Sequence, residues 1–116
     1  MFQEIKDALP ISGDDYDGQI ILEINACVLD LTTSAEIVLP GEVDITRELD
    51  EQTGVWTITD ESTLKDPLIM TAIATWCNMR IGYPPNYDQL LKAYESLKGQ
   101  LRLSKTYTSY EEDETA

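Results

Sequence analysis

The sequence contains no histidine, few bases and no apolar run long enough to cross a membrane. Histidine is the commonest general base and a frequent metal ligand, so its absence argues against catalysis. A spanning helix needs about 20 apolar residues, and the first residues also lack the basic and apolar regions of a signal peptide. The sequence therefore predicts neither an enzyme nor a membrane protein, and we expect a protein that is made and kept inside a cell.

Motifs for metals and cofactors are also missing. Cys27 and Cys77 lie in helical apolar patterns without a CxxC or Cys/His cluster, which favours two buried free thiols over a disulfide or a metal pair. The acidic run 14–17 resembles the start of a calcium loop, but Ile20 and Ala26 stand where that loop needs glycine and glutamate. No glycine-rich phosphate loop occurs. The sequence thus predicts no metal site and no cofactor.

Positive charge is scarce. Eight lysines and arginines oppose 22 aspartates and glutamates, which gives a formal net charge of −14. Binding to nucleic acid through released counterions needs the opposite sign, so a DNA-reading protein is disfavoured. A protein that repels or mimics DNA remains compatible with this charge, and so does the simpler interpretation that acidity maintains solubility.

The charge is also unevenly distributed along the chain. No base occurs between Lys6 and Arg47, whereas acids are frequent there, and this predicts a negative surface at one end of the molecule. Bases gather instead near the C-terminal end, where they are expected to pair with acids of the same or an adjacent chain. These bases are Lys92, Lys98, Arg102 and Lys105.

Four segments carry the apolar period of a helix, at about 2–9, 15–35, 66–82 and 86–104. Asp66 before Pro67 is typical of a helix cap, Gly82 is expected to end the third helix, and Asn86 with Gln89 suggests a capping box. The turn at 12–15 offers cap residues for the second helix.

The apolar stripes predict which helix faces are buried. The second helix carries a main stripe through Ile20 and Ile24 and a second one formed by Ile21, Leu22 and Leu29, so we expect it to bury two faces, one of them against a neighbouring subunit. The stripe expected to be buried on the fourth helix comprises Tyr87, Leu90, Leu91, Tyr94, Leu97 and Leu101. The residues expected to pack the third helix against the fourth are Leu68, Ile73, Trp76, Leu97 and Leu101.

Between the helical segments the apolar period changes to two. Ile45, Arg47 and Leu49 alternate with polar residues, and 55–59 is rich in strand-favouring types. This predicts a β-hairpin arm at about 43–60, with Gly54 at a bulge or in the left-handed conformation. An isolated hairpin is marginally stable in water, so we expect the arm to pack against the helices or against another chain.

These patterns predict a mainly α fold: a small bundle of about four helices, with an inserted β-hairpin arm and an extended C-terminal tail. Residues 1–104 form a single domain, and residues 105–116 form an extended acidic tail without helical period. Tyrosines are favoured interface anchors, so the tail and the arm are the candidate partner-binding segments. The candidate partner-binding residues there are Tyr107, Thr108, Tyr110, Trp56, Ile58 and Lys105, and Arg102 at the end of the fourth helical segment is a further one.

Two segments resemble a known family. The first reads DPLI at 66–69, AI at 72–73 and IGYP at 81–84, and the second reads YESLKGQLRLS at 94–104. Together they resemble the head-tail connector proteins of long-tailed bacteriophages, also called adaptor or head completion proteins, particularly those infecting Gram-positive bacteria. The N-terminal helix pair matches only in layout.

The resemblance implies a structural virion protein that is assembled in the host cytoplasm. Such a protein forms a ring, a dodecamer, between the portal protein and the stopper or tail-completion protein, completes the head after packaging and extends the DNA channel. Acids facing that channel would repel passing double-stranded DNA and prevent specific binding. The candidate channel-facing acids are Asp14, Asp15, Asp17, Glu48, Asp50 and Glu51. The alternative is an acidic DNA mimic or inhibitor that acts as a monomer or dimer.

Overall fold

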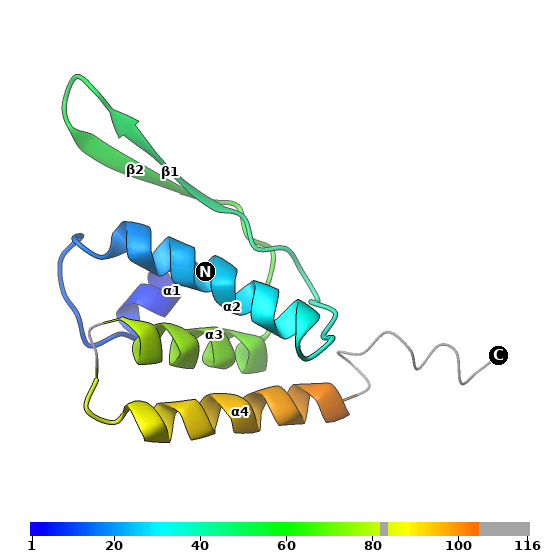
Figure 1. Ribbon diagram of the computed structural model, residues 1–116. Helices are drawn as coiled ribbons and strands as arrows, with labels where there is room; N and C mark the ends of the chain where they lie inside the picture. Colours follow the sequence, from blue (N-terminus) through cyan, green and yellow to red (C-terminus); the bar gives the residue numbers. More distant parts are fainter. Residues whose placement is uncertain (82–83, 105–116) are drawn as a thin grey trace.

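The computed structural model describes residues 1–81 and 84–104, and within them it contains four helices and one two-stranded sheet (Figure 1). This confirms the predicted helices with an inserted hairpin arm. The predicted tail at 105–116 lies outside the described residues. In chain order the elements are α1 (Phe2–Asp7), α2 (Asp17–Thr33), β1 (Ile45–Asp50), β2 (Val55–Asp60), α3 (Pro67–Arg80) and α4 (Tyr87–Leu103).

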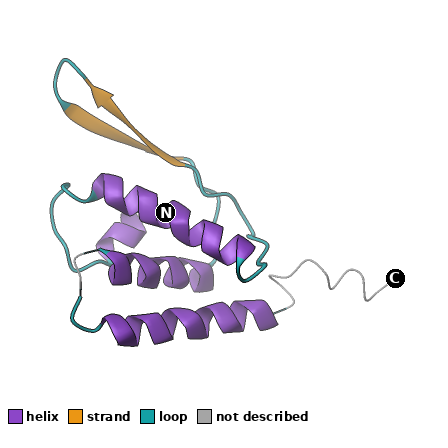
Figure 2. Ribbon diagram, viewed as in Figure 1, coloured by secondary structure: helices purple, strands orange, loops and turns teal. Residues whose placement is uncertain are grey.

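Helix α3 occupies the middle of the helical body. It packs against α1, α2 and α4, and Figure 2 shows the helices gathered on one side with the strands outside them. One contiguous core joins these helices to the loops around the arm, as buried Ile37, Ile45 and Leu64 demonstrate. The fully buried side chains on the helices include Ile5, Ile20, Ile24, Leu31, Ile69, Ile73, Tyr94 and Leu101.

The arm is an antiparallel hairpin whose register pairs Ile45 with Asp60 and Asp50 with Val55. Its turn is closed locally: the Gly54 N–H donates to the Asp50 carbonyl at 2.7 Å, and the Asp50 carboxylate accepts the N–H groups of Gln52 and Thr53. Gly54 has φ +72°, a conformation that glycine adopts without steric cost. The prediction of a left-handed glycine at this position is confirmed.

The helix boundaries follow the local signals in part. The Asp66 carboxylate accepts the N–H groups of Leu68 and Ile69, both at 3.0 Å, so the predicted cap is confirmed. Helix α2 begins at Asp17 after Tyr16, whose side chain makes no capping bond, and not at the expected residue 15. Asn86 also makes no side-chain capping bond, so the predicted capping box is wrong. Gly82 lies outside the described residues.

The expected buried stripe of α4 is too wide. Tyr94 and Leu101 are buried and Leu97 packs against the core, but Tyr87 and Leu91 are exposed. The reason is that α4 is an outer helix that packs mainly on α3, so only a narrow stripe is covered. The remaining residues expected between α3 and α4 lie in or against the core, with Ile73 fully buried and Leu68 and Trp76 partly buried.

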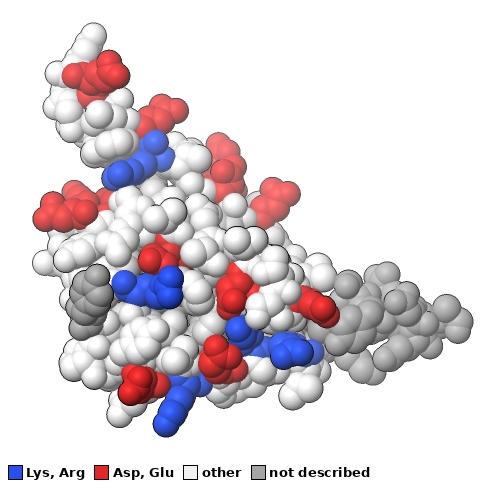
Figure 3. Space-filling view, in the orientation of Figure 1, with Lys and Arg blue, Asp and Glu red and all other residues white. Residues whose placement is uncertain are grey.

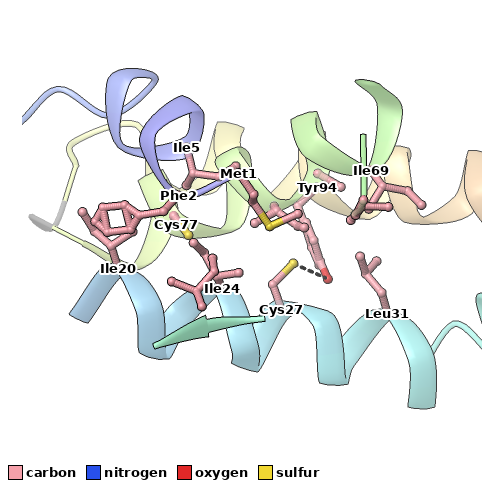
Figure 4. Close-up of a cluster of buried hydrophobic side chains, with 14 of the residues drawn as sticks. Met1, Phe2, Ile5, Ile20, Ile24, Cys27, Leu31, Ile69, Cys77 and Tyr94 are labelled. Atoms are coloured by element: carbon pink, nitrogen blue, oxygen red, sulfur yellow. Dashed lines mark hydrogen bonds between the residues drawn. The ribbon is translucent and has the colours of Figure 1, made fainter. Parts of the chain in front are cut away.

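Both cysteines are buried free thiols, as predicted. The Cys27 thiol donates to the Tyr94 hydroxyl, with 3.8 Å between sulfur and oxygen (Figure 4). Burial raises the pKa of Cys27 to about 12 and raises that of Cys77 as well. Neither thiol is therefore a nucleophile near neutral pH, since the reactive form is the thiolate.

The end of the arm is tied to the start of α1 through Asp60. One carboxylate oxygen of Asp60 accepts the Met1 amino group and the Phe2 N–H, each at 2.7 Å, and the other accepts the Ser62 N–H. Burial by itself would raise the pKa of Asp60, but these hydrogen bonds outweigh it and hold the pKa below its ordinary value. The carboxylate thereby anchors the arm on the helical body.

We expect Asp60→Asn to lower the free energy of unfolding by about 1 kcal/mol near neutral pH, a value reduced by the partial exposure of the site. Because the folded pKa is depressed, the stabilisation is fully present above the unfolded pKa of about 4 and is lost progressively as the pH falls from there through the lower folded pKa. Urea unfolding of both proteins between neutral and acidic pH measures this. Glu61→Gln at the exposed neighbouring residue is the control and should change stability little at any pH. If the difference in free energy of unfolding between wild type and Asp60→Asn stays the same at low pH, the Asp60 carboxylate is not the source of the stabilisation.

Candidate interaction surfaces

The tip of the hairpin arm carries apolar side chains that the rest of the described chain covers only in part. Leu49 and Trp56 are cross-strand partners and lie on one face of the arm, and both are about half exposed. The Arg47 guanidinium lies 4.0 Å from the centre of the Trp56 ring and holds it in place. Ile58, opposite Arg47, packs against the core. We name the surface formed by Leu49 and Trp56 the arm face.

Helix α2 has a second exposed apolar surface, and it lies opposite the buried side of the helix. Leu22 and Leu29 are 67% and 63% exposed, and their spacing of two helical turns places them one above the other. Asn25 and Ala26 lie between them on the same side. We name this surface the α2 face. Ile21, the third member of the predicted second stripe, packs against the core instead.

The acids of α2 are turned away from the α2 face by partners within the chain. Asp17 lies 2.9 Å from the Lys6 ammonium, and Asp30 lies 3.2 Å from the Lys98 ammonium. Glu23 accepts the Trp76 indole N–H at 3.1 Å and lies 3.5 Å from Nε of Arg80. Asp17 is buried on the inner side of the helix and Glu23 and Asp30 lie on one flank, so none of the three carboxylates is on the α2 face. Figure 3 shows a band without charged atoms across the body at the position of α2.

A partly buried polar network joins α2 to α4. The Tyr94 hydroxyl donates to the Asp30 carboxylate at 2.6 Å, the Lys98 ammonium binds the same oxygen, and the Tyr94 ring meets Trp76 edge-on at 5.2 Å. Burial, followed by the bond to Asp30, raises the pKa of Tyr94 far above its ordinary value. The hydroxyl therefore stays protonated and acts as a fixed donor that sets the position of α4.

One predicted channel-facing acid is covered within the chain. Asp17 is only 9% exposed and lies beside Lys6, so it is not an open surface charge as we expected. Asp14 is exposed and pairs with the same lysine at 2.8 Å. The other candidates are exposed: Asp15 before α2, and Glu48, Asp50 and Glu51 on the arm.

The predicted partner-binding residues are separated in the structure. Trp56 and Ile58 lie on the arm, whereas Arg102 is exposed in the last turn of α4. Lys105, Tyr107, Thr108 and Tyr110 lie outside the described residues. Sequence reasoning found the apolar second stripe of α2, but it missed that Lys6, Lys98 and Arg80 neutralise the flanks of that helix. Pairs distant in sequence leave no local signal.

Among residues 1–81 and 84–104, no helix is long and apolar enough to cross a membrane, and no group of three or more acidic or sulfur ligands could hold a metal ion. The described residues form a helical body with a projecting arm, and both parts expose apolar side chains. A family model described as phage connector protein matches residues 1–108. The chain therefore belongs to the phage connector protein family. No curated protein and no solved structure matches it.

Proposed function

We propose that this protein is a structural subunit of the phage virion that forms a ring between the portal protein and the stopper or tail-completion protein. The observation that carries the proposal is membership of the phage connector protein family, which spans nearly the whole chain. In this role the ring completes the head after packaging and extends the DNA channel. Such a subunit acts by binding its neighbours and by forming part of the channel wall, and this requires no catalytic residue.

The charge of the protein supports a position around DNA. Each copy carries −14, and a ring of twelve such copies would repel a passing duplex from its wall. The acids Asp14 and Asp15 precede α2, and Glu48, Asp50 and Glu51 lie at the far end of the arm. We propose that these exposed acids face the channel, and we leave out Asp17 because Lys6 covers it.

An acidic DNA mimic that acts as a monomer or dimer is the competing function. It would account for the net charge, but not for membership of a connector family.

The test is to image the full-length protein after mixing it with its portal protein. We expect closed rings stacked on the portal, with a mass that corresponds to twelve copies. A matched sample without portal shows whether the ring forms by itself. If the protein stays monomeric or dimeric and does not bind portal, while it displaces DNA from a DNA-binding enzyme, the connector role is wrong and the mimic is correct.

A further inference from the structure

The α2 face and the arm face, both exposed among the described residues, are of different kinds and lie on different elements. The α2 face is a helical surface bounded by Leu22 and Leu29, and the arm face is a strand surface formed by Leu49 and Trp56. Figure 1 shows the arm projecting away from the helices, so its tip extends past its own body. A chain with two different apolar patches can form a contact in which each copy uses one patch on either side.

Charge restricts what can cover the α2 face. Two copies that each carry −14 repel one another, so a stable contact between copies must use surface that lacks acids. The α2 face meets this condition because Asp17 is buried beside Lys6, and Glu23 and Asp30 are engaged on one flank.

The threonine hydroxyls at the C-terminal end of the α2 face are satisfied within the helix. The hydroxyls of Thr32 and Thr33 donate to the carbonyls of Val28 and Leu29, at 2.9 and 2.6 Å. A partner that covers this end of the face therefore leaves neither hydroxyl without a hydrogen bond. The free-energy cost of removing these hydroxyls from water is correspondingly low.

The arm face has the side chains expected of a surface that binds the α2 face. Trp56 is a large amphipathic side chain that is pre-oriented by Arg47, and tryptophan is among the residues that most often dominate interface energies. This strand face carries Arg47, the only base of the arm, and its one acid, Asp60, is paired with the N-terminal amino group. Glu48 and Asp50 lie on the opposite face, so the arm face approaches another acidic copy with less repulsion than that face does.

We propose that the arm face of one copy binds the α2 face of the next copy, so that Leu49 and Trp56 pack between Leu22 and Leu29. The proposal rests on the proposed ring and assigns its subunit contact. The contact is head-to-tail: each copy donates its arm to one neighbour and receives an arm from the other. Such a contact propagates around a ring, whereas a contact of two α2 faces would end at a dimer.

The test uses two single-cysteine variants, and in the tested contact Leu22, Leu29 and Trp56 are kept while the cysteine itself replaces Leu49. Full-length Asn25→Cys and full-length Leu49→Cys are mixed and oxidised, and disulfides are mapped by mass spectrometry. A disulfide forms only if the two Cα atoms approach within about 7 Å, so it reports direct contact. The native thiols are buried and give little background. We expect the 25–49 link to exceed the 25–25 and 49–49 links several-fold.

Two further substitutions make the result specific. Leu22→Glu in the first protein or Trp56→Glu in the second should abolish the 25–49 link, because each places a carboxylate in the contact. Leu103→Glu adds the same charge at an exposed leucine of α4 and should leave the link unchanged. Absence of the 25–49 link, an excess of 25–25 links, or equal loss with Leu103→Glu would overturn the proposal.

The outcome separates this contact from the proposed function. If rings form on portal but no 25–49 link appears, the connector role stands and the assigned contact is wrong. If the link forms in solution while the protein never binds portal, the contact is correct and the connector role fails.

Discussion

Replacing Tyr94 with alanine is expected to lower the free energy of unfolding by about 3–5 kcal/mol, the largest stability effect of any single change considered. Tyr94 is 1% exposed and fills the space between α2 and α4, with its ring against Trp76. The substitution leaves a cavity and also removes the hydroxyl that donates to Asp30. Since small domains are stable by only about 5–15 kcal/mol, the variant should be partly unfolded at physiological temperature.

Two matched variants divide this effect into packing and hydrogen bonding. Tyr94→Phe keeps the ring and loses only the hydroxyl, so it should cost about 1–2 kcal/mol, with Lys98 still bound to Asp30. Tyr87→Ala removes a tyrosine from the exposed side of α4 and should change stability by about 0.5 kcal/mol or less. Urea unfolding at neutral pH measures all three. Equal losses for the alanine and phenylalanine variants would show that the ring is not the main contribution.

Deleting residues 105–116 is expected to abolish attachment of the protein to portal-containing capsids. The segment has no helical apolar period, but it contains Tyr107 and Tyr110, residues favoured as interface anchors. Because residues 1–104 supply the whole described core, helicity and melting temperature of the isolated subunit should be nearly unchanged. Sedimentation of capsids after mixing with wild-type or truncated protein measures attachment.

A shorter truncation separates the tyrosines from the acidic end of the tail. Removing residues 111–116 keeps both tyrosines and should leave attachment close to that of the full-length protein. If the protein that lacks residues 105–116 still joins capsids normally, the tail is only a solvated end, and attachment depends on the helices or the arm.

The helices and the arm could be predicted because their signals are local. Helical periodicity is set by residues three and four positions apart, and strand alternation by neighbours two apart, so both are visible along the chain. The cap at Asp66 and the left-handed Gly54 involve bonds or dihedral angles within a few residues. The same reasoning placed Cys27 in the core, since it continues a helical apolar stripe.

The sequence by itself determined the mainly helical fold with its inserted arm, the strong negative charge and the presence of two apolar stripes on α2. Only the tertiary structure decided which stripe faces outward and which acids are covered. Lys98 meets Asp30 across 68 residues of chain and Lys6 meets Asp17 from another helix, so neither pair has a periodic signal. Likewise, Tyr87 and Leu91 carry the same apolar period as Tyr94, but α3 covers only one side of α4. Periodicity identifies the faces of a helix, whereas the neighbouring elements determine which of those faces are buried.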